Sequence, residues 1–257
     1  MNILIINGSP HGASSNTLKV SQAFAEGIVD AIGGTVKVLD VYKMKISGCI
    51  GCFLCWRETP GKCIFDDDEE IIVDHILASD IVIWSFPVYY FGMPSKVRAV
   101  LERQIPYTSP LMTGSEEKMI NGGHKYRLVS EDKKFVLVST CGFYYTQKIF
   151  QSVEAEFDMM YGEGGYEKIF VGEGELLNKQ HLQKKLDAYL ANIKQGGKEY
   201  AGSGITSETR AKIDKIFYPM NIYAQIADAS WGMEKDAFKT EDGKTAARVE
   251  KIKNRFN

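Results

Sequence analysis

Residues 1–17 read Met-Asn-Ile-Leu-Ile-Ile-Asn-Gly-Ser-Pro-His-Gly-Ala-Ser-Ser-Asn-Thr. The first seven residues form a short, almost wholly apolar run, which is typical of a buried strand. The run breaks at Gly8, and a helical pattern follows the small, hydroxyl-rich loop. A helix N-terminus that follows a strand and such a loop presents unpaired backbone N–H groups, which favour anions. This stretch therefore predicts an anion site near the start of the chain.

The chain that follows completes a strand–helix–strand unit. Apolar residues recur at helical spacing from residue 16 to about 32, and Gly33-Gly34 then ends the helix. Residues 35–42 alternate in hydropathy as a second strand would. Two strands and a helix within 42 residues indicate a parallel sheet with helices on its faces.

Further strands are predicted at residues 80–86, 134–139 and 166–171. Residues 106–132 lack periodicity and are rich in Gly, Ser and charge, so we expect a surface excursion there.

A last helix with Leu182, Leu186 and Ile193 on one face closes the sheet domain. Gly196-Gly197 is expected to lie beyond the end of that helix. We therefore predict an α/β domain over residues 1–200 and a helical C-terminal extension over residues 201–257.

Bulk composition excludes several classes of protein. The net charge is -2, from 31 basic and 33 acidic residues among 257, which leaves no electrostatic footprint for nucleic acid or an anionic membrane. There is no run of 18 apolar residues and no signal-peptide pattern, so a cytoplasmic protein is expected. The five cysteines are then expected to be reduced, metal-bound or catalytic rather than disulfide-bonded.

Three loops follow the first, third and fourth predicted strands. Ligands of open α/β sheets bind at the carboxyl ends of strands, where the strand order switches. The loop after the third strand offers Tyr89, Tyr90 and Phe91, and the loop after the fourth offers Cys141 and Phe143. Aromatic rings and backbone amides suit a planar heteroaromatic ring with polar edges, and the first loop suits its phosphate. Together they predict a flavin mononucleotide (FMN) site.

Other interpretations of these loops were weighed. The first loop lacks G-x-G-x-x-G and does not end in Gly-Lys-Ser/Thr, which removes the two commoner nucleotide motifs. Gly243-Lys244-Thr245 resembles the end of a Walker loop, but no strand precedes it, so we attribute it to chance. Ser15 or Asn16 alone would also serve as a simple helix cap, and the aromatic residues would also serve as core.

Three motifs in order resemble the NADPH-dependent FMN reductase family, a flavodoxin-like group that includes the iron–sulfur flavoproteins. They are Gly8-Ser9-Pro10 with Ser15-Asn16-Thr17, the cysteine-rich stretch 49–67, and Pro87-Val88-Tyr89-Tyr90 with Pro94-Ser95. The resemblance covers about residues 1–195. It implies a three-layer flavodoxin-like sandwich with a five-stranded parallel sheet of order 2-1-3-4-5, and a homodimer or homotetramer whose subunits share the flavin pocket.

The resemblance also implies which residues hold FMN, with His11 as a donor to the phosphate. The expected cofactor-binding residues are Ser9, Pro10, His11, Ser15, Asn16, Thr17, Pro87, Val88, Tyr89, Tyr90, Phe91, Gly92, Thr140, Cys141, Gly142 and Phe143.

The implied activity is transfer of electrons from NADH or NADPH through FMN to a quinone, a nitro or azo compound, a free flavin or a protein. In that chemistry the flavin reacts while the protein orients and tunes it, so no catalytic acid or base is expected. The cysteine-rich loop, residues 106–132 and the C-terminal helices are expected to wall the second-substrate site.

Four cysteines form a compact quartet, Cys49-x2-Cys52-x2-Cys55-x7-Cys63. Two-residue gaps let three thiolates converge on one cluster, and a fourth can return from a short loop, as in a [4Fe–4S] site. The quartet resembles the cluster motif of the iron–sulfur flavoproteins. Zinc is an alternative, although two separated C-x2-C pairs are more usual for zinc. The other alternative is four reduced thiols in a loop that shapes the flavin pocket.

The quartet therefore leaves rival functions open. One is an electron-transfer iron–sulfur flavoprotein that takes electrons from ferredoxin through a [4Fe–4S] cluster. The other is a flavin-binding redox sensor whose thiols act as the switch.

Overall fold

The computed structural model describes residues 1–112, 120–130, 132–144, 146, 148–230, 247–248 and 250–251. The chain divides into two compact units, residues 1–216 and 217–257. Three sequence features lie partly or wholly outside the described residues: part of the expected excursion 106–132, part of the expected helical extension 201–257, and Gly243-Lys244-Thr245.

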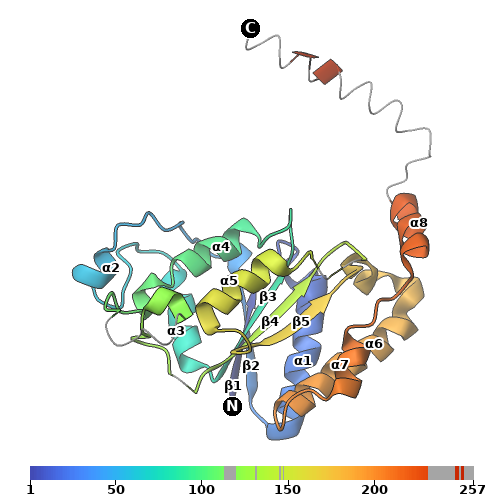
Figure 1. Ribbon diagram of the computed structural model, residues 1–257, viewed down its shortest axis with the longest axis horizontal. Helices are drawn as coiled ribbons and strands as arrows, with labels where there is room; N and C mark the ends of the chain where they lie inside the picture. The colour runs from blue at the N-terminus through green and yellow to red at the C-terminus, as the bar shows by residue number, and fades with distance from the viewer. Residues whose placement is uncertain are drawn as a thin grey trace. The chain divides into compact units, whose positions relative to one another are not determined.

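A five-stranded parallel sheet of order β2-β1-β3-β4-β5 organises the first unit (Figure 1). The predicted order and strand direction are confirmed. The strands are β1 (Asn2–Asn7), β2 (Thr35–Asp40), β3 (Ile81–Pro87), β4 (Lys134–Thr140) and β5 (Glu167–Val171).

Helices cover both faces of this sheet (Figure 1). The helices of the first unit are α1 (Asn16–Ile32), α2 (Leu54–Arg57), α3 (Glu69–Ala78), α4 (Ser95–Glu102), α5 (Gln151–Tyr161), α6 (Gln183–Tyr200) and α7 (Ser207–Ile213). The second unit contains α8 (Met220–Ser230). In Figure 1, α1, α6 and α7 lie on one side of the sheet, and α3, α4 and α5 on the other.

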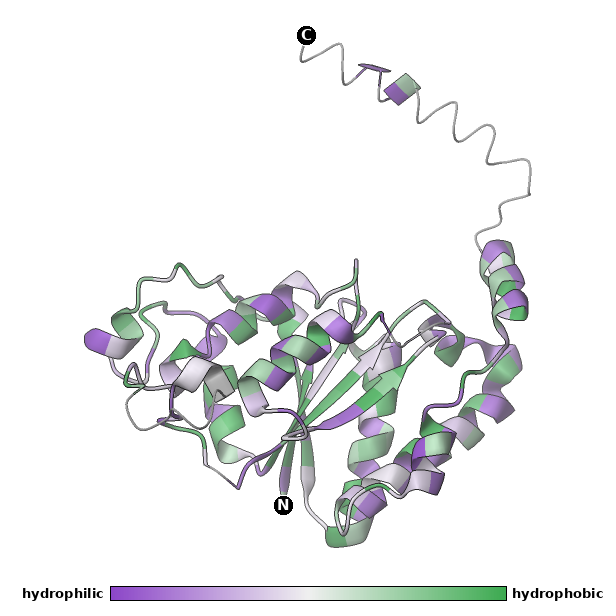
Figure 2. Ribbon diagram, in the orientation of Figure 1, coloured by the Kyte–Doolittle hydropathy of each residue, from purple (hydrophilic) through white to green (hydrophobic). Residues whose placement is uncertain are grey.

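Alternation along the central strands produces two buried layers. Leu4 and Ile6 of β1 belong to one continuous core with Trp84 of β3 and Phe157 of α5. Ile3, also buried, lies outside that core, because successive strand side chains point to opposite faces. Figure 2 shows the strands as mainly hydrophobic and the surrounding helices as mixed, which is typical of a parallel sheet buried on both sides.

The register places the ends of the strands together. Asn7 pairs with Ser85, Pro87 pairs with Thr140, and Thr140 pairs with Val171. The loops that follow β1, β3, β4 and β5 therefore meet at one edge of the sheet.

One sequence expectation about α6 was wrong. Gly196 and Gly197 do not lie beyond this helix but inside it, on the side that packs against α1. A Cβ atom at Gly197 would lie 2.0 Å from the carbonyl oxygen of Phe24, and one at Gly27 would lie 1.9 Å from that of Lys194. These glycines allow the two helix backbones to approach closely, so here the missing side chain serves packing rather than termination.

Gly197→Ala should therefore destabilise the protein, although alanine is the better helix former by about 1 kcal/mol. The clash is with backbone atoms, which cannot rotate away, and overpacking of this kind costs about 1–3 kcal/mol or more. Urea denaturation followed by circular dichroism measures the change. Gly202→Ala is the control, because its Cβ would lie 3.6 Å from the nearest atom, the carbonyl oxygen of Glu199. Equal midpoints for the two variants would contradict this account.

Candidate functional site

A cleft of about 470 Å³ lies at the carboxyl edge of the sheet. Its volume falls in the range of roughly 300–1,000 Å³ common for small-molecule sites. All of its walls come from loops after strands or from the start of α1. The lining residues are Ser9, His11, Ser14, Ser15, Asn16, Thr17, Lys19, Pro87, Val88, Tyr89, Thr140, Cys141, Gly142, Gly174, Glu175 and Asn178.

The first loop provides the N-cap of α1, and polar side chains lie around it. Ser15 is the N-cap of α1, and its Oγ accepts a hydrogen bond from the Leu18 N–H at 3.1 Å. Thr17 of α1 and Thr140 of β4 share a buried hydroxyl–hydroxyl hydrogen bond of 2.6 Å. The expected helix cap therefore exists, and it forms part of the wall of the cleft.

Asn16 is placed to hold a ligand. Its Nδ2 donates to the Gly174 carbonyl oxygen at 2.8 Å, while its Oδ1 is buried with no hydrogen-bond partner in the described part of the chain. The N–H groups of Asn16 and Thr17 belong to the first turn of α1, where no preceding helical carbonyl exists to accept them. This end of the cleft offers N–H and O–H donors, which suit a phosphate. Lys19, whose Nζ donates to the Leu177 carbonyl oxygen at 3.2 Å, also lines the cleft.

The second loop contributes only in part. Pro87, Val88 and Tyr89 line the cleft, but Tyr90 and Phe91, which follow them in the loop, are not among its lining residues. Both have left-handed backbone angles, with φ of 47° and 64°, and Tyr90 is 98% exposed. Non-glycine residues in this conformation carry strain of about 1–3 kcal/mol each, and such strain clusters at functional sites.

Five of the expected FMN-binding residues do not line the cleft of this chain. They are Pro10, Tyr90, Phe91, Gly92 and Phe143. The Phe91 ring stacks on the ring of Phe143, with centroids 5.8 Å apart and an interplanar angle of 20°. The loops after β3 and β4 thus contact each other through two exposed aromatic rings that do not line the cleft.

A fourth loop, after β5, was missed in the sequence. Gly174, Glu175 and Asn178 line the cleft. The available signal was the pair Gly172 and Gly174 directly after a strand. A Cβ at Gly174 would lie 3.1 Å from the Cys141 carbonyl oxygen, so the loop needs glycine to pack there.

Cys141 is buried beside this loop. Burial raises the pKa of its thiol to about 11, while a hydrogen bond to the Phe143 carbonyl acts in the opposite direction and the charge of Glu175 adds to the rise. The thiol is therefore neutral at pH 7 and acts as a small apolar group in the wall. None of the residues lining the cleft comes from the stretches 48–66 or 106–132, as far as the chain is described.

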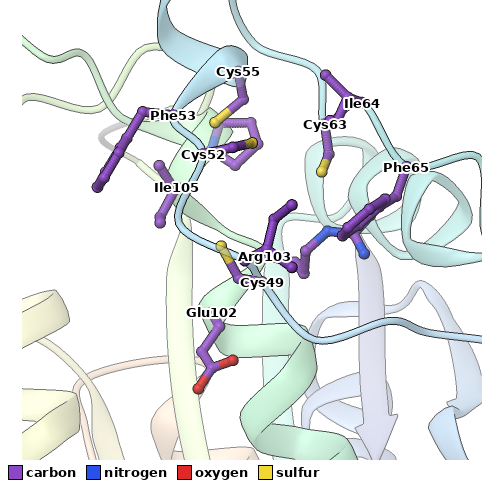
Figure 3. Close-up of a pocket in the computed structure, with 12 residues that line it drawn as sticks. Cys49, Cys52, Phe53, Cys55, Cys63, Ile64, Phe65, Glu102, Arg103 and Ile105 are labelled. Atoms are coloured by element: carbon purple, nitrogen blue, oxygen red, sulfur yellow. The ribbon is translucent and has the colours of Figure 1, made fainter.

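The four remaining cysteines line a second pocket, which we call the cysteine pocket (Figure 3). Its other walls are mainly apolar. The lining residues are Cys49, Ile50, Cys52, Phe53, Cys55, Cys63, Ile64, Phe65, Glu102, Arg103, Ile105 and Pro106. Four cysteines that are close in the sequence thus line the same pocket.

The donor set of the cysteine pocket is four thiols, a ligand type found in both zinc and iron–sulfur sites. Within the described residues, no three His, Cys, Asp or Glu side chains converge closely enough to hold one metal ion. In a [4Fe–4S] cluster each cysteine bonds a different iron atom, so the thiols surround the group from a wider separation. The zinc alternative requires all ligands within about 2.3 Å of one centre.

Two acidic residues that follow the cysteines, Asp67 and Glu69, both have buried side chains but different surroundings. Asp67 forms a buried ion pair with Arg103, with side-chain exposures of 3% and 1%. Burial opposes ionisation of Asp67, but hydrogen bonds from Arg103 and from two backbone N–H groups outweigh it and lower its pKa to about 2. Glu69, in contrast, is 2% exposed, and neither carboxyl oxygen has a hydrogen-bond partner among the described residues.

Burial raises the pKa of Glu69 to about 8, with the Arg103 charge opposing the rise and the Asp67 charge adding to it. Glu69 is thus mainly protonated at pH 7. At pH 7 it therefore contributes little negative charge to the first turn of α3.

A family model described as a flavodoxin-like fold matches residues 1–169. The chain belongs to this flavodoxin-like family. The resemblance indicated by the three sequence motifs is thereby confirmed. An iron–sulfur flavoprotein of Methanocaldococcus jannaschii is 28% identical over 106 residues, which are 41% of this chain and 53% of that protein. The chain spans about half the length of the curated relatives it matches.

Solved structures of flavodoxin-like enzymes share the fold at low identity. An NAD(P)H:quinone oxidoreductase from Methanothermobacter marburgensis has a TM-score of 0.53 and 17% identity, covering 77% of this chain and 96% of that one. An FMN-dependent NADH-azoreductase from Bacillus anthracis, solved with FMN, has a TM-score of 0.53 and 16% identity, covering 78% and 99%. Among the described helices of the flavodoxin-like chain, none is long and apolar enough to cross a bilayer.

Glu69→Gln should change how stability depends on pH. The folded state keeps the Glu69 proton up to about pH 8, whereas the unfolded chain releases it near pH 4.5. The stability that Glu69 contributes is thus complete below about pH 4.5 and is lost as the pH rises to about 8, an effect of a few kcal/mol at most.

Glutamine stays neutral throughout, so the variant should gain stability over the native protein progressively from pH 5 to pH 8. Urea denaturation at several pH values measures this. Asp67 does not interfere, because its titration lies between its lowered pKa of about 2 and 3.8. Parallel pH profiles for the two proteins would show that Glu69 is ionised in the fold.

Proposed function

We propose that this chain is an FMN-dependent NAD(P)H oxidoreductase that passes electrons to a quinone, a nitro or azo compound, a free flavin or a protein. The observation that carries the proposal is the cleft at the carboxyl edge of the sheet. One end has hydroxyl and N–H donors around Asn16, and the other has Val88, Tyr89 and the backbone at Gly142. Two solved structures with the same fold, named as an NAD(P)H:quinone oxidoreductase and an FMN-dependent NADH-azoreductase, support the proposal.

The residues of the cleft suggest a division of labour. Ser9, Asn16 and Thr17 would hold the phosphate, and the loops after β3 and β4 would hold the ring. FMN would supply the redox chemistry, accepting reducing equivalents from NADH or NADPH and passing them on. The thiol of Cys141, neutral because burial raises its pKa, would line the ring site without competing as a nucleophile.

The oligomeric state implied by the family resemblance stays a prediction. The exposed rings of Tyr90, Phe91 and Phe143 lie beside the cleft and are suited to cover a bound ring or to meet a second subunit.

Asn16→Ala should weaken FMN binding about tenfold or more. It removes a polar side chain from the donor end of the cleft, and a lost hydrogen bond to a charged group costs about 1.5–3 kcal/mol. Quenching of flavin fluorescence during titration with FMN measures the dissociation constant. Asn192→Ala on α6 is the control, because Asn192 does not line the cleft. Native protein that binds no FMN, or equal affinities for the two variants, would refute the assignment of the cleft.

The electron donor is tested on the same FMN-loaded protein without oxygen. Addition of NADPH or NADH should bleach the flavin absorbance within seconds, as expected for turnover numbers of about 1–1,000 per second. Re-oxidation by a quinone or an azo dye then reports the acceptor. A flavin that stays oxidised with both nucleotides would exclude the reductase.

The cysteine pocket favours a second candidate function. Four thiols around one largely apolar pocket suit an iron–sulfur cluster, and three curated relatives, each matching about 40% of this chain, are named iron–sulfur flavoproteins. In that case the chain would transfer electrons between FMN and a redox partner such as a ferredoxin.

A further inference from the structure

Apart from the four cysteines, Arg103 is the residue lining the cysteine pocket whose position suggests a function. The pocket is lined by two charged residues, Glu102 and Arg103. Figure 3 shows the Glu102 carboxylate pointing away from the sulfur atoms, while the Arg103 side chain passes beside Cys49 toward Phe65. Arg103 thus places a positive charge against a site that would be anionic once its thiols are ionised.

The guanidinium of Arg103 is almost completely enclosed. Its Nη1 and Nη2 each donate to the Asp67 carboxylate at 3.0 Å, and Nη1 also donates to the Ser47 carbonyl oxygen at 3.0 Å. The ring of Phe65 lies 5.0 Å from the guanidinium carbon. The residue is 2% exposed, and Arg103 Nε has no hydrogen-bond partner among the described residues. A buried donor left unpaired costs about 1–3 kcal/mol.

The two partners of Arg103 stand at the two ends of the cysteine segment. Ser47 precedes residues 48–66, which carry all four thiols, and Asp67 follows them. Asp67 also accepts a hydrogen bond from the Ser47 N–H at 2.9 Å. Beside them, Lys45 and Asp68 exchange two further hydrogen bonds, of 2.6 and 3.0 Å. The two ends of the cysteine segment are therefore bonded to each other. Arg103, at the C-terminal end of α4, forms hydrogen bonds with both ends of the segment.

We propose that Arg103 is a positioning residue for the cysteine site: its guanidinium clamps Ser47 and Asp67, the two ends of the segment whose four thiolates would hold an anionic iron–sulfur group. The clamp reduces the conformational freedom that the segment must lose to bring four thiols together. Arg103 lines the pocket and its partner Asp67 does not, so the positive end of this ion pair favours a group that becomes more negative on reduction. Outer partners of this kind typically contribute 10–100-fold to metal affinity. The inference rests on the iron–sulfur candidate above and not on the FMN cleft.

The test compares Arg103→Gln and Arg103→Lys with Arg98→Gln. Arg98 lies on the same helix but is exposed and pairs with Glu156 on the surface, so it is a matched control. Each full-length protein is reconstituted without oxygen with ferrous iron and sulfide. Loss of iron to a chelator is then timed, and the midpoint potential of the iron–sulfur group is measured.

Arg103→Gln should release iron about tenfold faster or more, and its midpoint potential should shift to a more negative value. Arg103→Lys should recover much of the potential, since it keeps the charge, but little of the retention, since it lacks the planar fork that bonds both ends of the segment. Arg98→Gln should match the native protein in both measurements. Hydrogen exchange of residues 48–66 in the iron-free proteins should be faster in Arg103→Gln and Arg103→Lys than in Arg98→Gln.

Removing Arg103 leaves a buried carboxylate unpaired, which can prevent folding. The double variant Arg103→Gln/Asp67→Asn removes both charges and then carries the test of iron retention. Native rates and potential in folded Arg103→Gln would overturn the proposal, as would a native protein that takes up no iron. In the latter case an intact FMN titration and bleaching by NADPH would show that the proposed reductase stands. Protein that retains iron but binds no FMN would refute the reductase and leave the role of Arg103 in place.

Discussion

The pairing of β1 with β2 on one side and β3 on the other is the constraint on which the rest of the structure depends. Parallel strands need crossover connections, so every link between them is a helix or long loop that returns over a face of the sheet. The register then places Asn7, Ser85 and, one strand further, Thr140 near the same edge. Loops far apart in the sequence form one cleft because the backbone hydrogen bonds of these strands leave no other alignment.

Helix α4 connects that cleft with the cysteine pocket. In its first half Val97 packs against Gly8, where a Cβ would lie 2.1 Å from the valine side chain, so this backbone approach requires glycine. At its C-terminal end Arg103 reaches the base of the cysteine segment. One short helix thus packs against the backbone directly before Ser9, which lines the cleft, and also reaches the base of the cysteine segment.

The buried pair of Arg103 and Asp67 is a costly way to hold a loop, because both charges must leave water. Four hydrogen bonds to the Asp67 carboxylate offset that cost and keep its pKa near 2. Glu69, two residues further on, has no such partners and stays mainly protonated at pH 7. Neighbouring carboxylates of similar sequence therefore carry different charges, for reasons that only their surroundings supply.

The sequence by itself indicated the strands of the sheet, the strand ends at which the cleft lies and the grouping of the four cysteines. Apolar periodicity and cysteine spacing are local properties, so they can be recognised without knowing the tertiary contacts. The tertiary structure alone decided the rest. Gly196-Gly197 reads as a helix stop in the sequence, yet it lies in a helix contact, since close approach depends on a partner helix about 170 residues away. The place of Gly174 in the wall of the cleft and the pairing of Arg103 with Asp67 likewise depend on contacts between distant parts of the chain. No local sequence pattern encodes such contacts.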